Sequence, residues 1–299
     1  TIPNSTTRLT KSGNYVLKVY KEGEPDQVIF TKRFYCIDKK AEISALVMQA
    51  REPSLRNNSQ EVDVRVFSTS GLSFDNPRER IKLSIQQNGR TDNQRFLPLS
   101  EDKGVELVFN FRKENIFDGG NIFRTFDFTS LRQRSNFVSN IDYIGGENIV
   151  RLREEVLKAK SPFVSQNDLR GMYHIRNEFD DNASLCSDYA WVYFYLPMPL
   201  SLEGSYYVIG DLTDWRFSEQ NKFVFDNTLN QYVLRLLLKQ GYYNYQILYL
   251  PYGHTQGSYR EVEGNHSEAK NRYNLFLYYR EPGNDYDSFI GYSASEYQY

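Results

Sequence analysis

Three histidines, His174, His254 and His266, are the side chains best suited to ligate a metal or transfer a proton near neutral pH. A zinc or general-base site needs ligands that converge, and these three lie in separate contexts with no metal-ligand spacing between them. The sequence also contains no GxSxG, GxGxxG or phosphate-loop motif. We therefore predict no catalytic residue, no metal site and no cofactor.

Two groups of carboxylates are close enough in sequence to act together. Asp211 and Asp214 flank one turn, and Glu178, Asp180 and Asp181 cluster in a polar segment. The first pair is predicted to cap its own turn through side-chain-to-backbone hydrogen bonds. The second group lacks the alternating oxygen donors and central glycine of a calcium loop, so we expect it to be solvated.

Trp215 follows the turn that contains Asp211 and Asp214. A tryptophan at such a place can stack on a sugar ring or a cation, or it can anchor a sheet edge with its indole N–H on a carbonyl. We favour the structural role. Trp215, with Tyr252 as a second platform, is nevertheless the candidate contact site for a glycan or a protein partner.

Cys36 and Cys186 are the two cysteines of the chain. A disulfide between them would need Cα atoms within about 7 Å of each other. Two cysteines do not make a disulfide framework. We expect them in different domains and unbridged.

The composition is that of a globular, strand-rich protein. Of 299 residues, 40% are apolar and 25% charged, and there are 24 Tyr and 20 Phe. The formal net charge of −2 argues against a nucleic-acid partner, which requires a clustered positive surface. The chain has no run of about twenty apolar residues, so we predict no membrane insertion.

The elements that must position these side chains are strands. Residues 12–20 and 28–37 are rich in β-branched and aromatic residues and flank a Gly-Pro turn, which predicts a hairpin. A lone hairpin is marginal in water. These strands must therefore complete a sheet that starts before Thr1 or pack onto the next domain. The chain starts without Met and shows no signal peptide, so we expect it to be an excised fragment.

From residue 41 the pattern is that of a β-sandwich. Apolar residues alternate with polar ones around Val64, Leu83 and Phe109, and Asn88-Gly89 is a hairpin turn signal. Residues 148–177 are ambiguous, because residues 151–160 suit either a short amphipathic helix or a strand entering a charged loop. Further strands are expected at 189–196, 206–209, 222–226, 231–238, 242–250 and 273–280.

These patterns predict an all-β protein of tandem immunoglobulin-like β-sandwich domains. The expected segments are a hairpin that ends a truncated domain (1–40), a central sandwich (41–176), a linker (177–187), an early-set sandwich (188–282) and a partly ordered tail (283–299).

The last of these domains resembles the early-set, family-48 glycogen-binding module. The resemblance rests on Val208-Ile-Gly-Asp-Leu-Thr-Asp-Trp215, on Leu238-Lys-Gln-Gly241 and on Tyr245-Gln-Ile247. In sugar-binding members a Trp stacks on glucan, as Trp215 would. The family's Lys is replaced here by Gln246, and no second Trp occurs near residues 251–253, so two of the three sugar contacts are absent.

A second resemblance covers nearly the whole chain. It rests on short motifs in a fixed order: Ser12-Gly-Asn-Tyr-Val-Leu-Lys-Val-Tyr20, Gln60-Glu-Val-Asp63, Gln87-Asn-Gly-Arg90, Phe123-Arg-Thr-Phe-Asp127, Ser130-Leu-Arg132, Leu236-Leu-Leu-Lys-Gln-Gly-Tyr-Tyr-Asn-Tyr245, Glu263-Gly-Asn-His266, Tyr278-Tyr-Arg280 and Ile290-Gly-Tyr292. These resemble the type IX secretion plug domain family of Bacteroidetes, first catalogued as a domain of unknown function.

The resemblance implies an exported, all-β protein of the periplasm, associated with the outer membrane. One member of that family is thought to occlude the periplasmic mouth of the outer-membrane translocon. We therefore expect a non-catalytic protein that binds an outer-membrane translocon protein and occludes its channel. The alternative is a glycan-binding module that uses Trp215.

Overall fold

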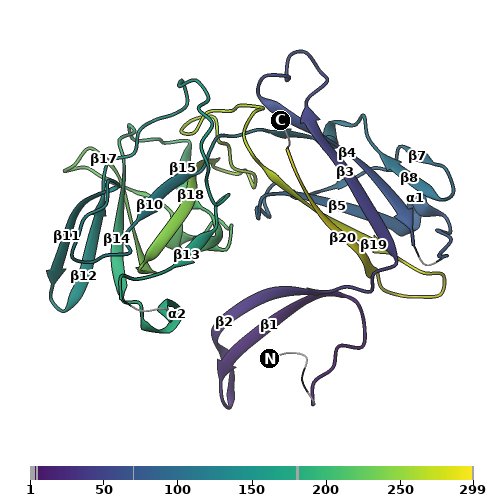
Figure 1. Cartoon of the computed structure of the whole chain (residues 1–299), viewed down its shortest axis with the longest axis horizontal. Coiled ribbons are helices and arrows are strands. Elements are labelled where there is room, and N and C mark those ends of the chain that lie inside the picture. The colour runs from purple at the N-terminus through teal and green to yellow at the C-terminus, as the bar shows by residue number, and fades with distance from the viewer. Residues whose placement is uncertain (1–3, 5, 70, 180–181, 298–299) are drawn as a thin grey trace.

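The computed structural model has three parts, a hairpin near the N-terminus and two β-sandwiches that lie beside each other (Figure 1). It describes residues 4, 6–69, 71–179 and 182–297. None of the helices in these residues has the length and apolar character that a membrane crossing requires. Strands make up nearly all of the regular structure, so the predicted all-β class is confirmed.

The predicted N-terminal hairpin is present as a two-stranded antiparallel sheet. It consists of β1 (Gly13–Lys21) and β2 (Glu24–Cys36). A register shift opposite the end of β1 leaves Ile29 without a cross-strand partner, because Val19 pairs with Phe30 and Tyr20 with Val28. The hairpin lies below both sandwiches in the view of Figure 1.

The first sandwich contains two sheets. One has the order β3 (Ala41–Gln49), β4 (Ser59–Ser68), β8 (Glu106–Phe109), β7 (Glu101–Asp102), with β9 (Ile116–Asp118) also paired to β4. The other has the order β20 (Ser288–Glu296), β19 (Arg272–Tyr279), β5 (Ile81–Gln87), β6 (Arg95–Leu97).

The apolar alternation predicted for these strands faces the space between the two sheets. Val62, Val64 and Val66 of β4 and Leu83 and Ile85 of β5 are all buried in one cluster. A fully buried Val, Leu or Ile side chain stabilises the fold by about 1.5–3 kcal/mol. This alternation therefore fixes which face of each strand turns inward.

The second sandwich also contains two sheets. One has the order β11 (Val138–Ile144), β12 (Glu147–Leu152), β14 (Tyr189–Leu196), β17 (Gln231–Lys239), β16 (Val224–Asp226). The facing sheet has the order β10 (Arg124–Asp127), β18 (Gly241–Pro251), β13 (Tyr173–Ile175), with β15 (Gly204–Ile209) also paired to β18.

Strand β18 is covered on both faces. Tyr243, Tyr245 and Ile247 point into the core of the second sandwich. On the opposite face Leu248 packs in a smaller cluster with Tyr259. Burial on both sides explains why this strand has a nearly continuous apolar and aromatic sequence rather than a strict alternation.

The helices are single turns that connect strands. They are α1 (Pro77–Arg80), η1 (Lys113–Asn115), α2 (Ala183–Cys186), η2 (Asp211–Thr213) and η3 (Glu219–Asn221). Residues 151–160, for which a short helix was an alternative, end β12 and continue as an irregular segment.

The sandwiches divide the chain differently from the predicted domains. The boundary expected at 176–188 lies inside the second sandwich, because β12 pairs in parallel with β14. The expected linker 177–187 instead crosses from β13 in one sheet to β14 in the other and contains α2. Asp180 and Asp181 lie outside the described residues.

The C-terminal strands β19 and β20 belong to the first sandwich and not to the predicted last domain and tail. Strand β19 pairs with β5, so it completes the first sandwich and not the domain predicted over 188–282. The tail predicted over 283–299 contains β20, whose Phe289 and Ile290 are buried. The second sandwich is therefore inserted between β9 and β19 of the first. Alternating polarity identifies a strand but not the strand with which it pairs, which is why the sequence missed this nesting.

The two cysteines are not bridged, as predicted. Cys36 ends β2 and Cys186 ends α2, in different parts of the fold.

Candidate binding surface

Trp215 lies where the two sandwiches meet. It follows η2, and its backbone is in the left-handed region. The backbone N–H of Trp215 donates to the carbonyl of Gly210 at 3.0 Å. The indole packs edge-on against Phe123, with ring centroids 5.9 Å apart. It also fills the space beside Gly89 and Gly171, where a Cβ atom would lie 2.3 Å from the ring. Gly89 belongs to the first sandwich, so Trp215 acts as a wedge between the two.

Tyr252 is far from Trp215. Gly204 of β15 pairs with Pro251, and Ile209 pairs with Gln246, so the two aromatic residues lie beyond opposite ends of β15. Five residues of strand span about 17 Å. Tyr252 is 63% exposed at a turn. The structure therefore does not bring the two candidate platforms into one site.

Gln246 stands where sugar-binding relatives of the early-set type have a lysine. It is buried, and its Nε2 donates to the carbonyl of Asn121 at 2.7 Å. Its side chain therefore belongs to the contact between elements and not to an exposed sugar-facing surface.

The carboxylates of the η2 turn have a different role from the predicted capping. Thr213 Oγ1 accepts from the N–H of Gly210, while Asp214 forms an ion pair of 2.6 Å with Lys32 of the hairpin. The hydrogen bond to Asp214 raises the pKa of Lys32. Burial raises the pKa of Asp211, and the positive charge of Lys32 lowers that pKa to a smaller extent. This turn is where the hairpin is attached to the second sandwich.

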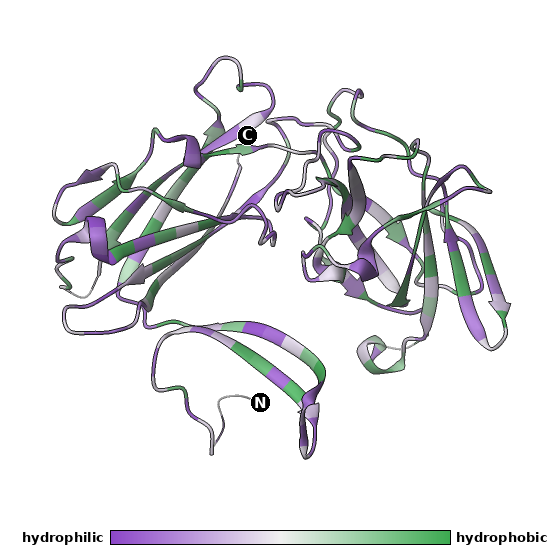
Figure 2. Ribbon diagram, turned by 180° about the vertical axis from the view of Figure 1, so that it is seen from behind, coloured by the Kyte–Doolittle hydropathy of each residue, from purple (hydrophilic) through white to green (hydrophobic). Residues whose placement is uncertain are grey.

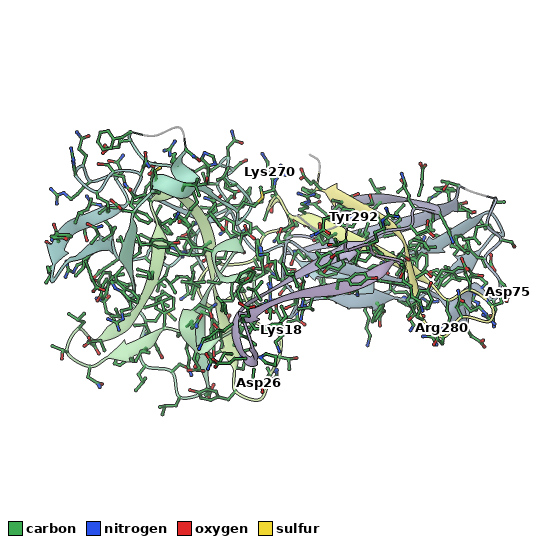
Figure 3. The ribbon with its side chains drawn as sticks, turned by 90° about the horizontal axis from the view of Figure 1, so that it is seen from below. Lys18, Asp26, Asp75, Lys270, Arg280 and Tyr292 are labelled. Atoms are coloured by element: carbon green, nitrogen blue, oxygen red, sulfur yellow. The ribbon has the colours of Figure 1, made fainter. Side chains whose placement is uncertain are left out.

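The other end of the hairpin rests on the first sandwich. Tyr35 packs against Phe276 and Phe289, with ring centroids at 5.1 and 5.9 Å, and Tyr278 Oη donates to Asn14 Oδ1 at 2.8 Å. The hairpin therefore spans both sandwiches. In Figure 3 its residues Lys18 and Asp26 lie across the region where the sandwiches meet.

The hairpin also presents apolar side chains to solvent. Val16, Ile29 and Phe30 are 61%, 66% and 50% exposed. Figure 2 shows the corresponding green bands on both strands of the hairpin. Large contiguous apolar patches on a protein surface are typical of interaction sites.

A cleft of about 710 Å³ lies beside this hairpin, between Lys32 and the outward side of β17. Trp191 and Arg235 line it, and the Arg235 guanidinium stacks at 4.8 Å over the Trp191 ring. Leu237, also in the lining, is 51% exposed. Trp, Tyr and Arg are the residue types that dominate binding energy at protein interfaces.

Residues of several sequence motifs are buried where the two sandwiches meet and in the segments that connect them. Arg90 is fully buried, pairs with Asp92 and lies 4.6 Å over the ring of Tyr259 from the second sandwich. Arg124 Nε of β10 donates to Glu263 Oε1 at 2.8 Å, which joins two motifs 139 residues apart. The sequence alone predicted no pairing for these residues.

Amide side chains of the first sandwich hold the segments that connect it to the second. Gln60, Gln87, Asn271 and Tyr273 are buried and linked to one another by hydrogen bonds. Gln60 donates to the carbonyl of Ser267 in one connecting segment, and Asn271 donates to the carbonyl of Gly119 in the other. The two connecting segments also bond each other directly, since the N–H of His266 donates to the carbonyl of Gly120 at 2.8 Å.

The three histidines remain apart. His174 is on β13, His254 follows β18 and His266 is in the connection to the first sandwich. No group of three or more His, Cys, Asp or Glu side chains suited to a metal ion occurs among the residues that the structure describes.

These features define an all-β protein of two nested sandwiches, crossed by a hairpin with an exposed apolar surface. Residues 1–38, which include this hairpin, match the family model described as the type 9 secretion system plug protein first domain. This match supports the type IX secretion plug family that the motifs predicted, and it suggests a role associated with type IX secretion.

A solved structure agrees over the whole length. It is the crystal structure of a hypothetical protein from Parabacteroides merdae ATCC 43184, which is 29% identical, with a TM-score of 0.95. The similarity covers 99% of this chain and 75% of that one. None of the curated proteins matches the chain. The early-set assignment of the second sandwich stays a prediction.

Proposed function

We propose that the protein is a non-catalytic, periplasmic component of type IX secretion that binds an outer-membrane translocon protein and occludes its channel. The observation that supports this most is that the segment matching the plug family, residues 1–38, presents several exposed apolar side chains on one hairpin, among them Val16, Ile29 and Phe30. A surface of this kind needs a partner to cover it.

The rest of the molecule suits a steric role. Two sandwiches joined by buried contacts of Arg90 and Asp92 with Gly257 and Tyr259 present a bulky body, which a blocking element requires. Next to the hairpin, Trp191 and Arg235 supply anchors of the type found at interface hot spots. Binding would therefore use surface contacts on the hairpin side of the molecule.

The test is affinity purification of the tagged full-length protein from an outer-membrane fraction. We expect a channel component to be recovered with the wild type and lost with Ile29→Asp, which places a charge among the exposed apolar side chains of the hairpin. Val105→Asp is the matched control, because Val105 is 78% exposed on the first sandwich, away from the hairpin. Recovery of no channel component with the wild type, or equal recovery with Ile29→Asp, would overturn the proposal.

A further inference from the structure

A second, smaller cleft lies between the two sandwiches. It has a volume of about 270 Å³, and Trp215 of the second sandwich faces Tyr292 and Arg272 of the first across it. Clefts between domains are preferred places for small ligands. Tyr292 is labelled in Figure 3, on β20 near the meeting of the sandwiches.

Arg272 is the unusual residue of this cleft. Its cross-strand neighbour on β20 is Glu296, but the carboxylate of Glu296 is ion-paired with Arg170. Within residues 4, 6–69, 71–179 and 182–297, Arg272 makes no ion pair, and its buried Nε has no hydrogen-bond partner. A buried donor without a partner is rare in folded proteins and calls for an explanation, such as a bound ion.

The polar neighbours of Arg272 are already engaged with one another. The backbone N–H of Arg272 donates to Asn88 Oδ1, Asn274 Nδ2 donates to the carbonyl of Asn88, and Tyr292 Oη donates to Asn274 Oδ1 at 2.9 Å. These bonds fix the walls of the cleft. Arg170 and Asp211 also line the cleft; Arg170 is paired with Glu296, and burial raises the pKa of the Asp211 carboxyl. Arg272 is left with a buried donor that has no partner.

We propose that this cleft binds an oxyanion, a carboxylate or a phosphate carried by a small ligand. Arg272 would hold it through its two Nη–H groups, a two-pronged geometry that suits both anions, because its Nε is enclosed by protein. The remainder of the ligand would lie against the indole of Trp215. The site is separate from the exposed hairpin surface, so it goes beyond the proposed channel binding.

Tryptophan fluorescence can test the proposal, because the chain has two tryptophans. In a Trp191→Phe background Trp215 is the sole reporter. The probes are glucuronate, glucose 6-phosphate and neutral glucose, titrated at constant ionic strength. We expect a saturable change with one or both anions and none with glucose. A carboxylate site responds to the first probe and a phosphate site to the second.

Substitution at Arg272 then assigns the site. Arg272→Gln should weaken binding at least tenfold, while Arg235→Gln, whose guanidinium faces the other cleft, should leave it within twofold. If Arg272→Gln does not fold, the Nε–Hε resonance of Arg272 in the Trp191→Phe protein decides, since a bound oxyanion must shift it. No saturable response, an equal response to glucose, or binding that leaves Arg272 unaffected would each overturn the proposal.

Discussion

Arg90 is the residue whose loss should most clearly disturb the junction between the sandwiches. Its guanidinium donates to both carboxylate oxygens of Asp92, at 3.0 and 2.5 Å, and to the carbonyl of Gly257 at 2.9 Å. Arg90 and Asp92 are almost completely buried, with side-chain exposures of 1% and 6%. The perturbation is Arg90→Met, which keeps most of the volume and removes the charge.

The magnitude follows from the charge that is left behind. Removing one partner of a buried ion pair costs about 3–5 kcal/mol, because the other charge stays buried without compensation. The lost contact with Tyr259 is included in this range, since the terms are not additive. At about 2–4 °C per kcal/mol for a protein somewhat smaller than this one, the melting temperature should fall by roughly 10 °C.

The assay is urea unfolding followed by circular dichroism and by tryptophan fluorescence, with Arg90→Met and the double variant Arg90→Met/Asp92→Asn. The double variant removes the uncompensated charge, so it should regain at least half of the lost free energy of unfolding. A free energy of unfolding for Arg90→Met within about 1 kcal/mol of the wild-type value would refute the reasoning. So would a double variant that is less stable than the single one.

Three further predictions concern packing, pH and the hairpin. Gly89→Ala should destabilise the protein by about 1–3 kcal/mol, because the new Cβ would lie 2.3 Å from the Trp215 ring. In a Trp215→Ala background the same change should cost almost nothing. Equal losses of unfolding free energy in both backgrounds, measured by urea unfolding, would contradict the contact. Burial, with Tyr232 and Tyr249 nearby, raises the pKa of Tyr206 to about 12, so the folded state retains a proton that the unfolded state loses near pH 10. Stability should therefore be constant up to about pH 10 and fall as the pH rises towards 12, and an unchanged free energy of unfolding across that range would count against it. Lys32→Met should change the free energy of unfolding by less than about 1 kcal/mol, because the ion pair of Lys32 with Asp214 is exposed. Tyr35→Ala should make the hairpin more susceptible to limited proteolysis, because Tyr35 packs on the first sandwich. Equal cleavage rates in the two variants would refute this assignment of anchors.

The sequence identified the strands whose one face lies on a core and whose polarity alternates clearly. The strand predicted at 189–196 is β14 with the same limits, and those predicted at 231–238 and 242–250 differ from β17 and β18 by a single residue at one or both ends. Period-2 polarity is a local signal, so it survives without knowledge of the fold. The family was recognised from short motifs for the same reason, since residue identity needs no coordinates.

The candidate site was harder to predict than the strands. Trp215 was correctly singled out, but its neighbours Gly89 and Gly171 are distant in sequence, and its supposed partner Tyr252 lies at the other end of β15. Arg272 gave no signal at all, because an arginine at the start of a strand is ordinary. Only the placement of Glu296 beside Arg170 makes Arg272 an unpaired cation.

By itself the sequence determined the all-β class and the positions of strands such as β14, β17 and β18, and its motifs pointed to the plug family. The tertiary structure alone decided that the second sandwich is inserted into the first, that residues of distant motifs such as Arg124 and Glu263 pair in a buried site, and that the hairpin spans both bodies. The physical reason is that strand polarity is written in neighbouring residues, whereas pairing between strands and between charges depends on groups more than a hundred residues apart, such as Arg124 and Glu263.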